Sequence, residues 1–407
     1  MTAFFMRDSD HCRSILFLAG DLSGDAYSAR LAQCLAERHP GYMVHALGGK
    51  NLGRVVKKTG GVWISDTTNC SAIGLTVVFR LYFWARWMQC KMRRFVRAHP
   101  IDAVVLCDWG GFNCRQLDFF NEEGIPVLFY FPPRSWQRTG NAGLQFAPRA
   151  TRVATPFSWS ADRLNSAGGR AEWVGHPLLE TMPEPCNREA LRREFGVEAD
   201  EKLIALLPGS RMSEIRVLGP RLAAVAAALS LQGPIKFVVP VPAPLMDKVR
   251  RYFPPAVKIL VDRSADALRA CDAAVVKTGS ATLEAVVAGA PQVTVYDLGR
   301  AARIEWVLLW MWKRIPFIAM PNIILQRMLV PELLGLNCRT ATIAAAVRRL
   351  LESEEDGKAI ASGYEEIRVL LGGQLPLGAT ERTVEILEEM LQQPDEPGTA
   401  SPCSSRP

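Results

Sequence analysis

A short loop of glycine, serine and arginine has the residue types needed to hold a phosphate. Gly209-Ser210-Arg211 follows a run of apolar residues at 203–207, which predicts a buried strand. A glycine turn lets backbone N–H groups approach a phosphate, and the Arg211 guanidinium can neutralise its charge with a forked contact. The loop therefore indicates an anion site at the end of this strand.

A second loop of the same character follows another apolar run, at 273–276. It reads Thr278-Gly-Ser-Ala-Thr-Leu-Glu284, so that Gly279, Ser280 and Thr282 should lie near a helix N-terminus, where the dipole favours an anion. Glu284, one turn into that helix, can accept hydrogen bonds from a ribose diol. Either loop alone is equally typical of an N-capped helix start, but the two together favour a nucleotide diphosphate. GxxxxGK[ST] is absent, which disfavours a P-loop NTPase.

Three side chains are candidates for acid, base or orienting roles. Asp21 lies in the glycine-bounded loop at 20–25, where no GxGxxG supports dinucleotide binding. Asp108 ends the apolar run at 103–107 and can act as a general base or an orienting group. His176 precedes Pro177 at a predicted junction. A single histidine is more often structural, but this one would face both halves of the protein.

The elements that must position these residues alternate along the chain. Strand-like runs are followed by loops and amphipathic helices, which predicts an α/β fold with doubly wound parallel sheets and ligands at the carboxyl ends of the strands. The predicted strands are 15–19, 44–47, 103–107, 127–131, 152–155, 203–207, 236–239, 258–261, 273–276 and 292–295.

The alternation is interrupted once and then restarts. Residues 177–186 contain three prolines and predict a linker between two Rossmann-like domains that face a cleft, at 1–178 and 187–393. A helical segment from about 340 to 393 should close the second domain. Residues 394–407 are rich in Pro, Ser, Gly and Thr, and we expect them to be disordered.

Composition excludes several classes of protein. The 407 residues are 49% hydrophobic and 22% charged, which is typical of a globular protein and not of a disordered chain or a coiled coil. No uncharged apolar run reaches the ~20 residues of a membrane-spanning helix. The short run at 15–19 does not resemble a signal peptide. The ten cysteines show no CxxC spacing, so we expect reduced thiols in a cytoplasm rather than metal ligands.

Basic and aromatic residues are concentrated in two stretches, 80–97 and 303–314, which hold five of the ten tryptophans. Trp and aliphatic residues at helical spacing, flanked by Arg and Lys, predict helices lying on an anionic membrane. A nucleic-acid surface would also be basic and aromatic, but long aliphatic residues suit acyl chains better than bases. A buried core is the other alternative. The candidate contact residues are Trp84, Trp87, Arg93, Arg94, Trp306 and Trp310.

Eight short stretches form a pattern when they are taken together. They are AGDLSGD (19–25), AIGL (72–75), DWGGFN (108–113), YFPPRSW (130–136), VGHPL (174–178), LLPGSR (206–211), TGSATLE (278–284) and MPNII (320–324). In this order and spacing, over residues 14–340, the chain resembles the lipid-A-disaccharide synthase family of GT-B glycosyltransferases.

The resemblance implies a reaction and a place for it. Family members transfer 2,3-diacylglucosamine from its UDP derivative to 2,3-diacylglucosamine 1-phosphate, with inversion and without a metal, on the cytoplasmic face of the inner membrane. The C-terminal lobe would bind UDP-diacylglucosamine through the two loops, with Asn322 nearby. The N-terminal lobe would bind the acylated glucosamine phosphate acceptor and the anionic membrane surface.

The chain departs from the family at acidic positions. The family has Glu where Asp21 stands, and a second carboxylate, its presumed catalytic base, where Gly111 stands. Another family acid is replaced by Ser158. We therefore expect Asp108, with Asp21 and His176, to perform the acid, base or orienting work. The alternatives are an altered acceptor, or a non-catalytic relative that binds a UDP-sugar and acts as a regulatory or binding protein.

Overall fold

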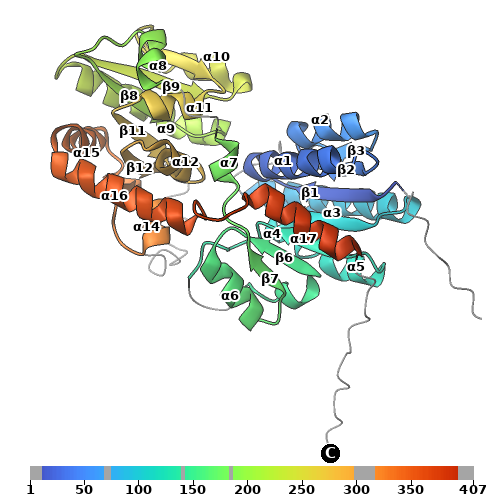
Figure 1. Ribbon diagram of the computed structural model, residues 1–407. Helices are drawn as coiled ribbons and strands as arrows, with labels where there is room; N and C mark the ends of the chain where they lie inside the picture. The colour runs from blue at the N-terminus through green and yellow to red at the C-terminus, as the bar shows by residue number, and fades with distance from the viewer. Residues whose placement is uncertain (1–11, 68–74, 139–142, 183–186, 298–316, 393–407) are drawn as a thin grey trace, which may run out of the picture.

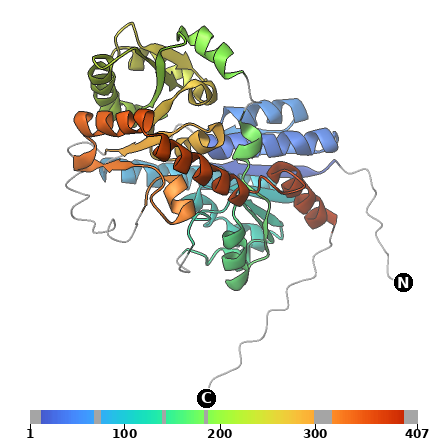
Figure 2. The same cartoon turned by 60° about the vertical axis from the view of Figure 1, so that its left-hand side comes forward.

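The computed structural model describes residues 12–67, 75–138, 143–182, 187–297 and 317–392, with the side chains of 75–81 excepted. Within these ranges the chain forms two lobes, each built on a parallel β-sheet (Figures 1 and 2). This confirms the predicted pair of Rossmann-like domains. All ten predicted strands are present within one or two residues at each end, because continuous apolar runs are typical of strands covered on both faces.

The described part of the N-terminal lobe has a seven-stranded sheet in the order β3-β2-β1-β4-β5-β6-β7. The strands are β1 (Ser14–Ala19), β2 (Met43–Leu47), β3 (Trp63–Ser65), β4 (Ala103–Cys107), β5 (Val127–Tyr130), β6 (Arg152–Thr155) and β7 (Ala171–Trp173). The helices are α1 (Leu22–Arg38), α2 (Lys50–Thr59), α3 (Leu75–Ala98), α4 (Gly110–Asn113), α5 (Leu117–Glu122) and α6 (Ser158–Ser166). Apolar side chains of α1 and α2 cover one face of the sheet, and those of α3, α5 and α6 cover the other.

The described part of the C-terminal lobe has a six-stranded sheet in the order β10-β9-β8-β11-β12-β13. Its strands are β8 (Lys202–Leu207), β9 (Ile235–Val241), β10 (Lys258–Val261), β11 (Ala273–Lys277), β12 (Gln292–Tyr296) and β13 (Glu332–Leu334). The helices are α8 (Arg188–Phe195), α9 (Met212–Ser230), α10 (Met246–Arg250), α11 (Ser264–Ala270), α12 (Ala281–Ala288), α14 (Met320–Leu325), α15 (Thr340–Glu352) and α16 (Glu354–Leu370). The short strands β3, β7 and β13 were not predicted, since three residues show no clear periodicity.

Each sheet has one point at which the strand order reverses. In the N-terminal lobe it lies between β1 and β4, and in the C-terminal lobe between β8 and β11. Loops after such neighbouring strands diverge to opposite faces of the sheet and leave a crevice in which ligands bind. The predicted site residues Asp21, Asp108, Ser210 and Ser280 all lie in these four loops.

The chain crosses between the lobes twice, and the two crossings touch. The first leads into α7 (Leu178–Thr181), and the second joins α16 to α17 (Ala379–Gln392). The His176 N–H donates to the Leu371 carbonyl at 2.7 Å. Gly175 and Gly372 have φ of +86° and +92°, and a β-carbon on Gly372 would lie only 2.8 Å from Cα of Gly175. The left-handed backbone favours glycine at both positions, and Gly372 in addition has no room for a β-carbon.

The second crossing corrects the predicted domain boundary. We expected the closing helices to belong to residues 187–393 as one domain, but α17 packs on the N-terminal lobe (Figures 1 and 2). Its buried residues Val384, Ile386 and Leu387 join the core formed by α1 and β1. The apolar face of α17 was visible in the sequence, but the lobe that it covers was not.

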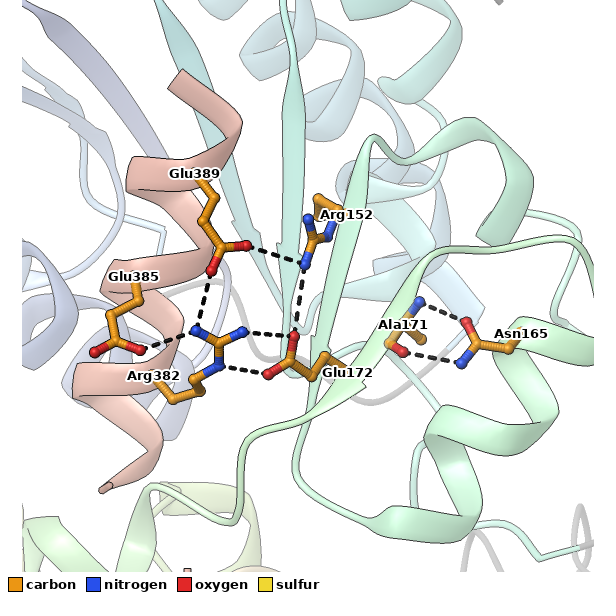
Figure 3. A network of polar contacts seen from close by, with 7 residues as sticks. All are labelled: Arg152, Asn165, Ala171, Glu172, Arg382, Glu385 and Glu389. Carbon is orange, nitrogen blue, oxygen red and sulfur yellow. Dashed lines mark hydrogen bonds and ion pairs between the residues drawn. The ribbon is translucent and has the colours of Figure 1, made fainter. Parts of the chain in front are cut away.

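A charged network fixes α17 to the edge of the N-terminal sheet (Figure 3). The Arg382 guanidinium donates two hydrogen bonds to Glu172 on β7, at 2.5 and 2.9 Å, and also contacts Glu385 and Glu389. Arg152 lies 3.5 Å from both Glu172 and Glu389. Because Arg382 is only 27% exposed and makes a bidentate contact, this network is stronger than an isolated surface pair.

Replacing Arg382 by Met should loosen α17. We expect a loss of about 1–2 kcal/mol in the free energy of unfolding, since three carboxylates lose their shared partner. Amides of residues 379–392 should exchange faster with solvent. The matched control is Arg327→Met, which breaks the exposed Arg327–Glu366 pair and should change stability by less than about 0.5 kcal/mol. Equal effects of the two substitutions would contradict the role given to the network.

Candidate active site

The cleft between the lobes has a volume of about 400 Å³ and is lined by residues from all four switch-point loops. Asp21 and Asp108 line it from the N-terminal lobe, and Ser210 and Ser280 from the C-terminal lobe. The Ser23 and Ser280 hydroxyl oxygens are 3.4 Å apart across the cleft. The fold therefore brings together residues that are more than 250 positions apart in the sequence.

Three helices begin at this cleft. The residues that precede the first turns of α1, α9 and α12 are Asp21, Arg211 and Ser280, and all three line the cleft. Helix N-termini present unpaired N–H groups and a partial positive charge. The cleft is consequently suited to an anion although several carboxylates line it.

Asp108 is the carboxylate most perturbed by its position in the cleft. Burial, and secondly the negative charge of Asp21, raise its pKa from the ordinary 3.8 to about 6, while a hydrogen bond from the Trp109 N–H lowers it. Asp21 itself caps α1, because its carboxylate accepts a hydrogen bond from the Gly24 N–H at 2.7 Å. Asp108 thus has the pKa of a general base near neutral pH, and Asp21 is partly committed to holding a helix end.

The residues after Asp108 hold it in an unusual backbone conformation. Asp108 and Trp109 have φ of 45° and 46°, in the left-handed region. The indole of Trp109 stacks on Phe112, with ring centroids 4.1 Å apart, and covers Gly20 so closely that a β-carbon there would overlap the ring. The Asn113 amide donates to the Asp108 carbonyl at 2.9 Å. Gly111 is exposed, and no described atom would lie within 4 Å of a β-carbon there.

His176 lies in the cleft wall as a neutral ring. Burial lowers its pKa to about 3, and Nδ1 accepts a hydrogen bond from the Leu178 N–H at 3.1 Å, so that the ring proton is on Nε2. The aromatic rings of Tyr27, Phe131 and Phe157 surround it edge-on. The prediction of His176 as an acid or base is wrong for this environment near neutral pH, whereas an orienting role through Nε2–H remains a prediction.

The first donor-side loop differs from expectation in one respect. The N–H groups of Ser210 and Arg211, predicted to face a phosphate, donate to Oε2 of Glu214 at 3.0 and 3.2 Å. Gly209 has a φ of +112°, and a β-carbon there would lie 2.2 Å from that same oxygen. The glycine is therefore needed for the Glu214 carboxylate to close the turn. What this loop offers a ligand is the Ser210 hydroxyl and the half-exposed Arg211 guanidinium.

In the second donor-side loop the structure separates cleft residues from supporting ones. Gly279, Ser280 and Glu284 line the cleft, and burial raises the pKa of Glu284, which accepts a hydrogen bond from the Ser264 hydroxyl at 3.4 Å. Thr282 is fully buried, and its hydroxyl donates to the Gly279 carbonyl at 2.7 Å. The prediction that Thr282 contacts the donor is wrong, because its hydroxyl holds the loop.

The predicted donor contact of Asn322 is also wrong. It is fully buried outside the cleft lining, and its amide donates to the Val330 carbonyl at 2.9 Å and to Glu332 at 2.8 Å. Glu332 also accepts hydrogen bonds from the N–H groups of Ile318 and Ala319. Asn322 therefore binds neighbouring loops of the protein rather than the donor.

The basic aromatic stretch at 80–97 belongs to α3, whose two faces differ. Met88 and Met92 are fully buried, while Tyr82, Phe83 and Trp87 are 54%, 68% and 55% exposed. Arg86 and Arg94 are exposed on the same helix. Trp87 and Arg94 thus lie where a membrane contact requires them.

Two other members of the predicted patch point inward. Trp84 packs against the core beside Trp109, with ring centroids 6.0 Å apart, and Arg93 stacks on Phe119 at 4.6 Å. Both side chains are half-buried, so a surface contact through them stays a prediction with less support than one through Trp87 and Arg94. Trp306 and Trp310 lie outside the described residues.

Tyr27, Glu214 and Lys277 are among the residues that line the cleft and that sequence reasoning did not select. Glu214 lies three residues after the N-cap Arg211 and accepts a hydrogen bond from its N–H, as the Glu of a capping box does, but Arg211 is not a capping-box N-cap residue and the sequence shows no clear signal. The Lys277 Nζ lies 2.8 Å from Oε1 of Glu214.

Among the described residues there is no group of three or more His, Cys, Asp or Glu side chains arranged to hold a metal ion. None of the described helices combines the length and apolar character needed to span a bilayer.

Two parallel-sheet lobes that face each other across a cleft at both switch points define the GT-B fold. MurG of Acinetobacter baumannii, a solved structure, has this fold with a TM-score of 0.55 and 16% identity, covering 93% of this chain and 100% of that one. The family model of lipid-A-disaccharide synthetase matches residues 15–375.

Two relatives agree with this match over nearly their whole length. The lipid-A-disaccharide synthase of Myxococcus xanthus is 31% identical over 387 residues, which are 93% of this chain and 97% of that protein. The enzyme of the same name from Syntrophus aciditrophicus is 29% identical over 94% of this chain and 98% of its own. The chain belongs to the lipid-A-disaccharide synthetase family and is a glycosyltransferase of the type that forms the lipid A disaccharide.

The raised pKa of Asp108 predicts that Asp108→Asn stabilises the fold near neutral pH. Between about pH 4 and 6 Asp108 is protonated in the folded protein but ionised in the unfolded chain. The buried Asp108 carboxylate therefore lowers the free energy of unfolding above about pH 6, and this destabilisation disappears as the pH falls towards 4. We expect a gain of about 1–3 kcal/mol at pH 7 and none below about pH 4 in urea unfolding. The exposed Asp200→Asn is the control and should show no such pH-dependent gain. Identical behaviour of the two variants would disprove the raised pKa.

Proposed function

We propose that the chain transfers 2,3-diacylglucosamine from UDP-2,3-diacylglucosamine to 2,3-diacylglucosamine 1-phosphate by an inverting displacement in this cleft. The observation that carries the proposal is the convergence of Asp108, from one lobe, with two helix N-termini and Arg211, from the other. Family membership supplies the substrate class, and the M. xanthus and S. aciditrophicus relatives carry the name of this activity. No cofactor is required, since the UDP-sugar is a substrate.

The C-terminal lobe supplies the groups that suit a nucleotide diphosphate. The N-termini of α9 and α12 and the Arg211 guanidinium offer positive charge to the phosphates, and Ser210 and Ser280 offer hydroxyl donors. Glu284, one turn into α12, is a buried acceptor for the ribose hydroxyls. As UDP leaves, the bond between the sugar C1 and the phosphate oxygen breaks, and these groups stabilise the electron pair that the phosphate keeps.

The N-terminal lobe supplies the base. As an acceptor hydroxyl oxygen forms its bond to C1, its proton passes to the Asp108 carboxylate, directly or through one water. A pKa of about 6 keeps Asp108 ionised at pH 7 and still basic enough to accept the proton. The neutral His176 ring, with its proton on Nε2, can donate a hydrogen bond to a substrate oxygen in the same cleft.

The exposed face of α3 suits a peripheral contact with the cytoplasmic surface of the inner membrane. Phe83, Trp87 and Arg94 follow one another at intervals of four and seven residues and therefore share one side of the helix. Aromatic rings with neighbouring arginines are typical of helices that lie among anionic lipid headgroups. Such a contact would bring the cleft to the acylated donor and acceptor.

Asp108→Asn should lower kcat by about 10²–10⁴-fold on UDP-diacylglucosamine and the diacylglucosamine phosphate, since the base is lost. UDP affinity should be unchanged, because the UDP loops belong to the other lobe. In the unsubstituted enzyme, kcat/KM should fall about tenfold per pH unit below pH 6, as Asp108 becomes protonated. Gly111→Asp, for which there is room, should raise the rate.

Two results would contradict these roles. If the unsubstituted enzyme and Asp108→Asn turn over equally, Asp108 is not the base. If purified enzyme forms no disaccharide from any acylated glucosamine pair while still binding UDP, the non-catalytic alternative becomes the better account. Since Asp108→Asn is expected to be the more stable protein, unfolding cannot explain a loss of its activity.

Replacing Arg86 and Arg94 by Glu should release the protein from vesicles containing anionic lipid. Each basic residue near such a surface contributes about 1 kcal/mol, so reversing two charges should weaken binding at least about tenfold at low salt. The control is Lys57→Glu with Lys58→Glu, the same change of charge on α2 at the opposite face of the sheet. A flotation assay in which the unsubstituted protein ignores anionic vesicles, or in which both double variants detach equally, would exclude a contact through α3.

A further inference from the structure

Lys277 lies in the cleft beside both donor-side loops, but the proposed function assigns it no contact with the donor. It is the last residue of β11, at the switch point, and its side chain lines the cleft while remaining only 18% exposed. Its Nζ is 2.8 Å from Oε1 of Glu214 and would be 3.8 Å from a β-carbon on Gly279. The ammonium group therefore lies between the loop that begins α9 and the loop that begins α12.

The balance of charge in the cleft makes this position significant. Among the described residues that line the cleft, the carboxylates are Asp21, Asp108, Glu214 and Glu284, and the cationic side chains are Arg211 and Lys277. His176 adds no charge because burial holds it neutral. A diphosphate between the two loops would be repelled by this surplus of carboxylates unless both cations faced it.

We propose that Lys277 binds the diphosphate of the sugar nucleotide directly, together with Arg211, and that Glu214 positions both cations. This inference rests on the proposed function of the cleft. Glu214 is fixed by the N–H groups of Ser210 and Arg211, so it is a permanent part of the turn. Its second oxygen holds Lys277 and lies 3.6 Å from Arg211. An ammonium group has three N–H donors, which leaves two for phosphate oxygens after the bond to Glu214.

The test is a binding series with uridine, UMP and UDP on Lys277→Met, measured by calorimetry at low salt. Methionine keeps most of the apolar stem and removes the charge. UDP affinity should fall about ten- to a hundredfold, as expected for the loss of one charge-assisted contact, and uridine affinity should not change. Lys236→Met is the matched control, because Lys236 pairs with Glu201 on the same lobe away from the cleft. It should bind all three ligands as the unsubstituted protein does.

A purely supporting role for Lys277 predicts different results. If Lys277 only holds the loops in place, uridine and UDP will weaken by the same factor, which overturns the inference. If it only neutralises Glu214, the loss of UDP affinity on replacing Lys277 will vanish in a Glu214→Gln background, which also overturns it. Glutamine preserves an acceptor for the Ser210 and Arg211 N–H groups. The inference requires that Lys277→Met with Glu214→Gln still bind UDP about tenfold or more weakly than Glu214→Gln alone.

Failure of the inference can be told from failure of the proposed function. If the unsubstituted protein does not bind UDP, or if Arg211→Met leaves UDP affinity unchanged, the donor site lies elsewhere and both fail. If the protein binds UDP, Arg211→Met weakens it and Lys277→Met does not, only the role of Lys277 is lost. Should Glu214→Gln fail to fold, the ligand series on Lys277→Met still decides between a phosphate contact and support of the loops.

Discussion

The contact between the two chain crossings is the constraint on which the cleft depends. Gly372 approaches Gly175 so closely that a β-carbon on Gly372 would lie 2.8 Å from Cα of Gly175, and the His176 N–H donates to the Leu371 carbonyl beside them. Each sheet offers its ligand crevice at a switch point, but a crevice in one lobe contains only half of the groups that a transfer between two substrates needs. Because the crossings fix the lobes at one point and α17 is anchored on the N-terminal lobe, the two switch points face each other.

Electrostatics in the cleft are divided between the lobes. The N-terminal lobe contributes Asp21 and Asp108, and burial, together with the negative charge of Asp21, raises the pKa of Asp108. The C-terminal lobe contributes two helix N-termini and the cations around Glu214. In the proposed displacement, the proton acceptor therefore comes from one lobe and the groups that stabilise the leaving UDP come from the other. An inverting displacement requires the acceptor to attack opposite to the leaving group, and a division of roles between two facing lobes is compatible with such an attack.

Much of this organisation could be predicted from the sequence, and the limits have physical causes. Buried parallel strands are continuous apolar runs, so ten strands and the four loops after the switch-point strands were visible. The apolar stripe of α17 identifies a packed face but not the lobe that it covers, so its placement could not be predicted. Asn322 and Thr282 are polar residues in motif positions, yet their side chains donate hydrogen bonds to backbone carbonyls inside the protein. The sequence alone cannot distinguish these supporting residues from neighbours such as Ser280 and Glu284, which line the cleft, because the distinction depends on the folded backbone.

The sequence resemblance implies a second carboxylate where Gly111 stands, and the proposed displacement does not require it. In the proposed displacement one proton leaves the acceptor, so one correctly aimed base is sufficient. Two consecutive residues with left-handed backbone cost about 1–3 kcal/mol each, and such strain persists only where the surroundings impose it. Here the Trp109 indole, packed on Gly20 and Phe112, and the Asn113 amide on the Asp108 carbonyl impose it. In the proposed mechanism these contacts position Asp108 at the cleft, and its burial raises its pKa to about 6, so that this one carboxylate can accept the proton near neutral pH.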